Sequence, residues 1–186
     1  AKCLMKIEKS RKACADFLDC QTSQVVFNSG SSESISSVFN HIFFQFKGSA
    51  KNKILISNIE HAACDNAAKF LSKNGFEVIY LETNSSGVIN LTKFNEVIKE
   101  HAKSIALICA MAANNETGVL QPYQEVGAIA QEHDILFLSD TTQLIGKDDF
   151  SFEKSKMDFA CLAGHKIGAL PGVGCLLIRS PKDFTP

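Results

Sequence analysis

The sequence lacks the features that mark nucleic-acid-binding and membrane proteins. Its 19 basic and 20 acidic side chains give a net charge of -1, so no excess of positive charge is present to attract a nucleic acid or an anionic membrane surface. No apolar run approaches the length that spans a bilayer. Residues 1–18 mix charged and apolar side chains and contain no continuous apolar stretch, so they do not resemble a signal peptide. These absences leave a small, roughly neutral molecule as the expected partner.

Nucleotide-binding and Cys-x-x-Cys motifs are absent as well. No Gly-x-x-x-x-Gly-Lys-Ser/Thr and no Gly-x-Gly-x-x-Gly occurs, which argues against a P-loop protein and against a dinucleotide-dependent dehydrogenase. The seven cysteines are odd in number, and several lie within apolar runs. This pattern is typical of reduced, mostly buried thiols and predicts a cytoplasmic protein.

What the sequence does have is a regular alternation of short apolar runs with stretches of helical spacing. Most of the apolar runs do not alternate with polar residues, as strands covered on both faces of a sheet require. Strands that alternate with helices predict crossover connections and a parallel sheet. We expect strands at residues 24–28, 53–57, 76–81, 104–112, 135–139, 158–162 and 174–179, and helices at residues 33–46, 62–73, 91–101 and 123–133.

The last connection of the predicted sheet differs from the others. Residues 164–173 contain no helical pattern, so the final strand is expected to run antiparallel to the strand before it. The fold class predicted is therefore α/β, with three layers around a mostly parallel mixed sheet. A chain of 186 residues with 45% hydrophobic content is long enough to bury one sizeable core.

Polar clusters follow the predicted strands at the places where ligands collect in such a fold. In an open α/β sheet, ligands bind outside the carboxyl ends of the strands. Five clusters lie there, at residues 28–34, 60–61, 114–118, 140–143 and 164–166. Because parallel strands end at one edge, these clusters are expected to share one site.

Each cluster has a chemical interpretation and an ordinary structural one. The Ser-Gly-Ser-Ser segment at 29–32 can direct backbone N–H groups and hydroxyls at an anion, or it can be a plain helix cap. Asp140 can stabilise a cation such as a pyridinium nitrogen, or it can simply end a strand. Burial favours a neutral, nucleophilic amine, so a buried Lys166 could form a Schiff base, whereas most lysines are solvated. His61 and His165 are structural histidines in the ordinary interpretation.

The order and spacing of these clusters resemble those of the cysteine desulfurases, in the class V aminotransferase group of fold type I pyridoxal phosphate enzymes. The similarity covers nearly the whole chain and is more specific than any single motif. The matching segments are Phe-Asn-Ser-Gly-Ser-Ser-Glu-Ser at 27–34, Glu-His at 60–61, Asn-Asn-Glu-Thr-Gly at 114–118 with Gln-Pro at 121–122, Asp-Thr-Thr-Gln at 140–143 with Gly-Lys at 146–147, and Gly-His-Lys at 164–166 with Gly-Val-Gly at 172–174.

The resemblance implies a pyridoxal phosphate site of eight residues and no metal. Two of them are expected to be catalytic: Lys166 forms the Schiff base with the cofactor, and His61 stacks on the ring and assists proton transfer. The expected cofactor contacts are Asp140 with the pyridine nitrogen, Gln143 with the ring hydroxyl, Ser31, Ser32 and His165 with the phosphate, and Asn115 near the ring hydroxyl and the substrate carboxylate.

The sequence also departs from the family pattern. Ala163 stands where the family usually has a Ser or Thr whose hydroxyl binds phosphate, so one phosphate contact is missing. Ser32 stands where Thr is usual, which keeps the hydroxyl. Residues 168–171, Gly-Ala-Leu-Pro, differ from the Gly-Pro-Lys that typically follows the cofactor lysine. Substrate preference could differ accordingly.

The resemblance implies the rest of the protein and its reaction. Residues 1–186 are expected to be the large cofactor domain, incomplete because an N-terminal segment and a C-terminal small domain are absent. The missing parts would carry the nucleophilic cysteine and the arginine that binds the substrate carboxylate. The implied reaction converts L-cysteine to alanine and an enzyme persulfide, for sulfur transfer in iron-sulfur cluster assembly. The implied partners are a second copy, forming a homodimer, and a sulfur-accepting scaffold protein.

Two other functions fit the sequence. Another class V reaction, by a selenocysteine lyase or a small amino acid aminotransferase, would use the same cofactor contacts. A catalytically inactive module would explain Ala163 and the short chain, and fold alone does not decide between these functions.

Overall fold

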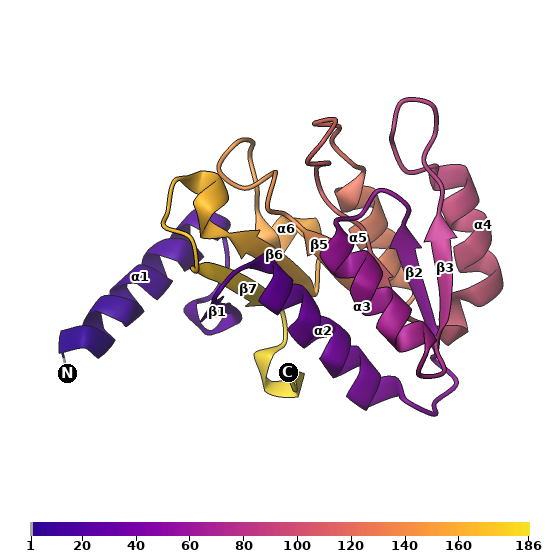
Figure 1. The fold of residues 1–186 in the computed structure, drawn as a ribbon, viewed down its shortest axis with the longest axis horizontal. Helices are drawn as coiled ribbons and strands as arrows, with labels where there is room; N and C mark the ends of the chain where they lie inside the picture. Colours follow the sequence, from indigo (N-terminus) through magenta and orange to yellow (C-terminus); the bar gives the residue numbers. More distant parts are fainter. Residues whose placement is uncertain (1) are drawn as a thin grey trace.

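The computed structural model describes residues 2–186 and has three layers, a central sheet between two sets of helices (Figure 1). The sheet has seven strands in the order β1-β7-β6-β5-β4-β2-β3. Each strand is four or five residues long and rich in branched apolar side chains. The strands are β1 (Val25–Asn28), β2 (Lys53–Ser57), β3 (Glu77–Leu81), β4 (Ile105–Cys109), β5 (Leu136–Asp140), β6 (Phe159–Ala163) and β7 (Gly174–Ile178).

The pairing of the strands confirms the mostly parallel mixed sheet. Strands β2 to β6 pair in parallel with one another, and β7 runs antiparallel to β6, as the helix-free connection predicts. Strand β1 lies at the edge and is antiparallel to β7. It therefore points the same way as β2 to β6, so six strands have their carboxyl ends at one edge of the sheet.

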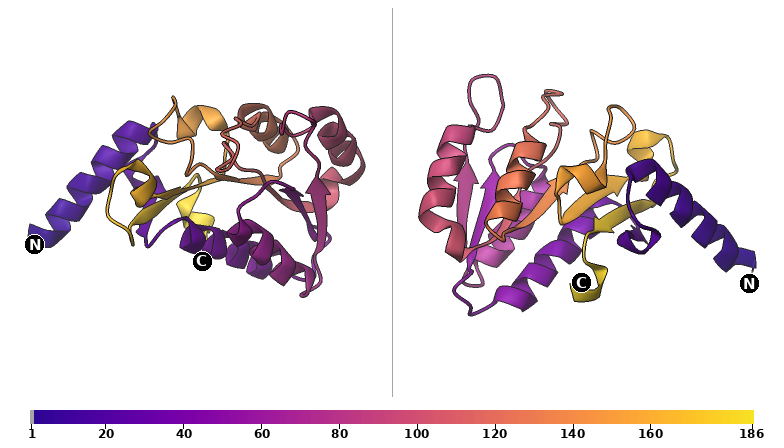
Figure 2. Two further views of the ribbon diagram at one scale, coloured as in Figure 1. Left: turned by 45° about the horizontal axis from the view of Figure 1, so that its top comes forward. Right: turned by 180° about the vertical axis from the view of Figure 1, so that it is seen from behind.

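Helices cover both faces of the sheet, and each face has its own apolar core (Figure 2). On one face, Ile35 and Val38 of α2 pack with Leu71 of α3. On the other, Phe94 of α4 and Phe152 of α6 pack with side chains from α1 and α5. The helices are α1 (Lys2–Leu18), α2 (Ser31–Phe46), α3 (Ala62–Ser72), α4 (Leu91–His101), α5 (Tyr123–Glu132) and α6 (Phe152–Ser155), with 3-10 turns at Thr22–Gln24, Ala102–Ser104, Gly164–Ile167 and Pro181–Asp183.

Two boundaries differ from the predicted ones in ways that shape the site. Helix α2 begins at Ser31, two residues earlier than predicted, so its first turn contains the serines expected to bind an anion. Strand β4 ends at Cys109, although the apolar run continues to Ala113. These extra residues stay buried, and Ala110 N and Ala112 N still donate to the carbonyl oxygens of Leu138 and Asp140 in β5.

Helix α1 projects away from the body of the molecule over its N-terminal half (Figure 2). Its C-terminal end is anchored, since Ala15 and Leu18 are buried. Its outer half exposes apolar side chains, and Leu4 and Met5 are each 63% exposed. Among the described helices, none has both the length and the apolar character required to cross a lipid bilayer.

Candidate functional site

A pocket lies at the carboxyl edge of the sheet and has a volume of about 440 Å³. This is within the range of small-molecule and cofactor sites. Segments far apart in the sequence line it, from the first turn of α2 to the loop after β6. The lining includes all eight residues expected to bind a cofactor: Ser31, Ser32, His61, Asn115, Asp140, Gln143, His165 and Lys166.

The N-terminus of α2 faces this pocket with its backbone N–H groups available. The residue before the helix is Gly30, and no side chain caps the helix there. The first N–H groups of a helix have no acceptor within the helix, and they carry partial positive charge. An anion in the pocket would satisfy them. Glu33 also lines the pocket, and its carboxylate is engaged by Ser29, accepting hydrogen bonds from Ser29 N (2.8 Å) and Ser29 Oγ (2.5 Å).

Two glycines allow the start of α2 to lie close against the sheet. Gly30 has a φ of +150°, which a residue with a side chain rarely adopts. Gly174 begins β7 directly beneath it, and a Cβ atom on Gly174 would lie 2.5 Å from the Cα atom of Gly30 and 2.5 Å from the carbonyl oxygen of Leu162. The start of α2 therefore fits against β7 only because both residues are glycine.

The loop after β5 connects the acidic side of the pocket with the start of α2. The Oδ1 atom of Asp140 accepts a hydrogen bond from Thr142 N at 3.0 Å, which fixes the carboxylate at the end of the strand. The Thr142 hydroxyl lies 2.6 Å from the Ser31 hydroxyl. In the same loop, Gln143 Oε1 accepts from Lys147 Nζ at 2.6 Å, so the amide N–H groups of Gln143 are free to donate into the pocket.

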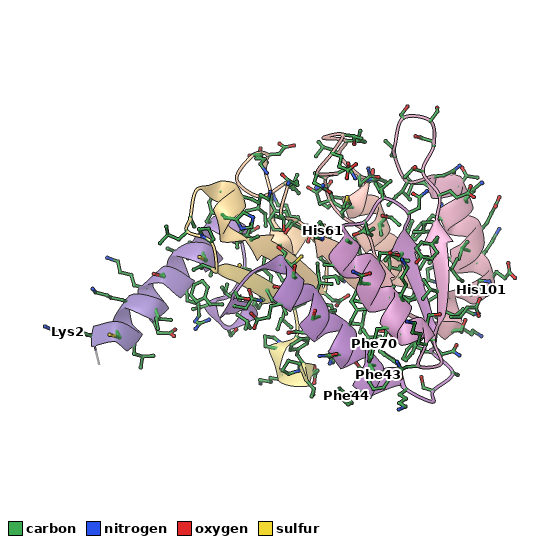
Figure 3. All side chains as sticks on the ribbon, in the orientation of Figure 1. Lys2, Phe43, Phe44, His61, Phe70 and His101 are labelled. Carbon is green, nitrogen blue, oxygen red and sulfur yellow. The ribbon has the colours of Figure 1, made fainter. Side chains whose placement is uncertain are left out.

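His61 lies at the N-terminal end of α3, at the edge where the strands end (Figure 3). Its Nδ1 atom accepts a hydrogen bond from Ala63 N at 3.1 Å and so caps the helix. Nδ1 therefore carries no proton in this arrangement, and Nε2 carries the proton of the neutral ring. The imidazole is exposed and lines the pocket.

Glu60, the residue before His61, is fixed by hydrogen bonds from Met111 and Ser57. Its Oε1 atom accepts a hydrogen bond from Met111 N at 2.6 Å, and it also accepts one from the Ser57 hydroxyl. Burial raises the pKa of Glu60 to about 7, with a smaller contribution from the charge of Asp140. The sequence pattern placed Glu60 beside His61 but did not reveal that its carboxyl turns away from solvent.

Buried thiols surround Glu60. Ligand atoms of Glu60, Cys64 and Cys109 lie within 4.8 Å of one another, a spacing that could hold a metal ion. The Glu60 carboxyl is already engaged by Ser57 and Met111. The hydrogen bond with Cys64 lowers the pKa of Cys109, but burial and the nearby groups Glu60, Cys161 and Asp140 together raise it to about 11, and the pKa of Cys64 is raised as well. The thiols therefore stay protonated at neutral pH, and the cluster is accounted for as packed core.

The loop after β4 presents Asn115 by means of the residue before it. Asn114 is buried, and its Oδ1 atom accepts hydrogen bonds from Glu116 N (3.0 Å) and Thr117 N (2.9 Å). Its amide group donates to the carbonyl of Ile59 at 3.1 Å, next to the segment that carries His61. Asn114 thus folds the loop, while Asn115 stays exposed and lines the pocket.

Lys166 lies in the 3-10 turn that follows β6, together with His165. The turn ends at Gly168, whose φ is +88°. Both Lys166 and His165 are exposed at the pocket. The described chain therefore does not provide the burial that would favour a neutral amine at Lys166.

Other pocket residues were not among the eight expected. They are Ser29, Gly30, Glu33, Met111, Ala113, Thr142, Ala163, Pro171 and Gly172. Thr142 is the most informative of them because it is 8% exposed, polar and hydrogen-bonded to two expected site residues. The signal was its position between Asp140 and Gln143, which alone does not reveal where its hydroxyl points.

The model of the aminotransferase class-V family matches residues 1–184, so the chain belongs to that family. Within it, the chain is similar to cysteine desulfurases. It is 32% identical over 174 residues to the mitochondrial cysteine desulfurase of Eremothecium gossypii, covering 94% of this chain and 35% of that protein. It is 34% identical over 173 residues to cysteine desulfurase IscS of Rickettsia typhi, covering 93% of this chain and 41% of that protein.

Solved structures give the same result. A NifS-like protein superimposes with a TM-score of 0.93 at 33% identity, covering 100% of this chain and 50% of the other. A structure described as SspA in complex with cysteine superimposes with a TM-score of 0.93 at 33% identity, covering 100% and 53%. The chain thus has the fold of these proteins and spans about half their length or less.

Proposed function

We propose that residues 1–186 form the cofactor-binding large domain of a pyridoxal phosphate-dependent cysteine desulfurase. One observation carries this proposal: all eight side chains that the family resemblance assigns to such a cofactor, from five separate segments, line one pocket. The similar proteins that bear this name support the reaction. The activity proposed is that of the full natural protein, since the chain spans only part of the length of its relatives.

The chemistry of the pocket fits pyridoxal phosphate. The free N–H groups at the start of α2, with the hydroxyls of Ser31 and Ser32, suit a phosphate dianion. The carboxylate of Asp140 suits a protonated ring nitrogen, and the amine of Lys166 suits an aldehyde. We assign His165 to the phosphate as well, Gln143 as a donor to the ring hydroxyl, and Asn115 to the ring hydroxyl and the substrate carboxylate.

Proton movement is the task of Lys166 and His61. Pyridoxal phosphate, when bound, withdraws electrons from the α-carbon of an amino acid and makes its proton acidic. Lys166 is the amine that then takes and returns this proton. His61 keeps Nδ1 engaged with Ala63 N, so it offers its Nε2 proton toward the pocket.

Sulfur transfer requires a thiolate from elsewhere in the protein. In the proposed reaction the C–S bond of L-cysteine breaks and a new S–S bond forms, so that alanine and an enzyme persulfide result. No cysteine lines the pocket within the described chain. Four of the seven thiols, Cys64, Cys109, Cys161 and Cys175, are buried. We therefore assign the nucleophile to a segment outside residues 1–186, together with the arginine that binds the substrate carboxylate.

The surroundings of the protein are also part of this proposal. Seven free thiols support a reducing compartment such as the cytoplasm. The exposed apolar residues Leu4 and Met5 on the projecting half of α1 support contact with a second copy, as a homodimer. A sulfur-accepting scaffold protein of iron-sulfur cluster assembly would take the persulfide sulfur. Light scattering of the full protein tests the dimer, and a monomeric mass would contradict it.

The function is tested by titrating the full natural protein with pyridoxal phosphate and then supplying L-cysteine. We expect a visible absorption band in the wild type, its loss in Lys166→Ala, and its retention in Lys154→Ala, a matched change on the exposed surface of α6. Release of alanine from L-cysteine, with sulfide freed from the enzyme persulfide by an added thiol reductant, supports the desulfurase. Turnover of selenocysteine alone, or amino transfer to a keto acid, would replace it by another class V reaction. A protein that stays colourless would contradict the proposal and favour an inactive module.

A further inference from the structure

The hydroxyl pair of Ser31 and Thr142 lies where the start of α2 meets the loop after β5. The two oxygens are 2.6 Å apart, and 111 positions separate the residues in the chain. Thr142 is fixed from both sides, because its backbone N–H also donates to Asp140 Oδ1 at 3.0 Å. Both side chains line the pocket. The pair therefore connects the acidic end of the pocket with the anion-binding end.

The two hydroxyls carry two hydrogens, and the hydrogen bond between them uses only one. Each hydroxyl carries one hydrogen, and either atom can donate to the other. Neither hydroxyl makes a further hydrogen bond to a nitrogen or oxygen atom of the described residues. The thiol of Cys161 lies close to Ser31, but sulfur is a weak acceptor. One O–H group thus remains free to donate to a stronger acceptor in the pocket.

This donor and Ala163 lie at the carboxyl ends of neighbouring strands. Strands β5 and β6 are parallel, with Asp140 opposite Cys161. Strand β5 ends at Asp140, and Thr142 lies in the turn that follows it, whereas β6 continues to Ala163. Thr142 and Ala163 both line the pocket. Ala163 is buried and has no hydroxyl, where the family pattern that the sequence resembles has one for the phosphate. The pair can therefore supply a hydroxyl to the same pocket from the neighbouring strand end.

We propose that the Ser31–Thr142 hydroxyl pair donates to the cofactor phosphate in place of the hydroxyl that Ala163 lacks. This inference rests on the proposed function, because it requires that the pocket bind pyridoxal phosphate. It makes Thr142 a ninth cofactor-binding residue. It also refines the assignment of Ser31: the Ser31 hydroxyl donates to Thr142 and so acts on the phosphate through Thr142, while the backbone N–H of Ser31 faces the anion.

The test compares the affinities of the full protein for pyridoxal phosphate and for pyridoxal, which has no phosphate. Thr142→Ala is expected to weaken binding of pyridoxal phosphate about 10-fold, because a hydrogen bond to a charged group is lost. Pyridoxal should bind Thr142→Ala as it binds the wild type. Thr142→Ser keeps the hydroxyl and is expected to bind normally. The dissociation constant of inorganic phosphate should rise by a similar factor in Thr142→Ala.

Restoring a hydroxyl at position 163 in the Thr142→Ala variant tests the inference most directly. Adding Ala163→Ser to Thr142→Ala restores the hydroxyl from β6 and should recover most of the lost affinity. An equal loss for both ligands would overturn the inference, because it would mean that Thr142 only supports the loop. Unchanged affinity in Thr142→Ala would overturn it as well. Both results leave the proposed function standing, whereas failure of the wild type to bind pyridoxal phosphate would remove the proposed function itself.

Discussion

Helices α2, α3 and α4 all begin at the carboxyl edge of the sheet, but they begin in different ways. Helix α3 is capped by His61, and α4 is capped by Asn90, whose Oδ1 atom accepts from Thr92 N (3.1 Å) and Lys93 N (3.2 Å). Helix α2 follows Gly30 and has no side-chain cap. The capped helices satisfy their own N–H groups, whereas α2 leaves them to a ligand. Helix α5 at the same edge also begins without a side-chain cap, but it does not line the pocket. The open start of α2 is therefore the one that an anion in the pocket can reach.

The largest expected effect comes from the glycine that seats the open helix. Gly174→Ala would push a Cβ atom against backbone atoms of Gly30 and Leu162, and we expect it to lower the free energy of unfolding by about 3 kcal/mol. Urea denaturation measures this. The control is Gly118→Ala, which meets no atom within 4 Å but has a φ of +72° and should cost about 1 kcal/mol. Equal costs for the two variants would contradict the close fit of α2 against β7.

Glu60 gives the next largest effect, at the start of α3. Burial raises its pKa from 4.5 to about 7, so the folded state holds a proton that the unfolded state releases. The resulting contribution to stability is complete below about pH 4.5 and is lost as the pH rises toward 7. We expect it to total up to about 3 kcal/mol. Unfolding measured across this range should show the decline in the wild type.

Two variants test whether Glu60 is the carboxyl whose protonation stabilises the folded state. Glu60→Gln keeps an acceptor for Met111 N and should remove this decline. Glu33→Gln is the control, because hydrogen bonds from Ser29 lower the pKa of Glu33. Its contribution therefore has the opposite sign: it is present at higher pH and lost as the pH falls through the lowered pKa. Parallel stability curves for the wild type and Glu60→Gln would show that Glu60 does not take up the proton.

A negative charge in the first turn of α2 should affect the ligand more than the fold. Ser32→Asp places a carboxylate where the phosphate is proposed to bind, so it should weaken pyridoxal phosphate binding about 100-fold by repulsion. The same change is favourable to the helix dipole, so the unfolding free energy should not fall. Spectroscopic titration and urea denaturation of one preparation give both values. Unimpaired binding would show that the phosphate lies elsewhere.

The smallest effect is expected at the capped helix α4. Asn90→Ala removes the acceptor for Thr92 N and Lys93 N and should lower the free energy of unfolding by about 1 kcal/mol. Because α4 does not line the pocket, affinity for pyridoxal phosphate should stay unchanged. A loss of affinity in Asn90→Ala would contradict the account, because it would mean that a capped helix start also affects ligand binding.

Much of this arrangement follows from local sequence. The uninterrupted apolar runs predicted the strands to within a few residues, and the helix-free segment 164–173 predicted the reversal of β7, which the structure confirms. The polar clusters predicted which residues meet, because parallel strands end at one edge. All eight line the pocket, while their individual roles stay predictions.

The parts that could not be predicted depend on contacts between distant segments. The bond between Ser31 and Thr142 requires the early start of α2 to lie beside the loop after β5, two segments 111 positions apart in the chain. The raised pKa of Glu60 arises from desolvation, which only the packed structure determines. The exposure of Lys166 likewise depends on what covers its turn. None of these leaves a periodic signal in the sequence.

The most direct test of the central claim is to locate the cofactor on the chain. The full protein would be incubated with pyridoxal phosphate, reduced with borohydride and digested, and the added mass would be mapped by mass spectrometry. We predict that the mass is found on the peptide containing Lys166. Modification of other lysines with Lys166 untouched, or no modification at all, would contradict the assignment of this pocket to pyridoxal phosphate.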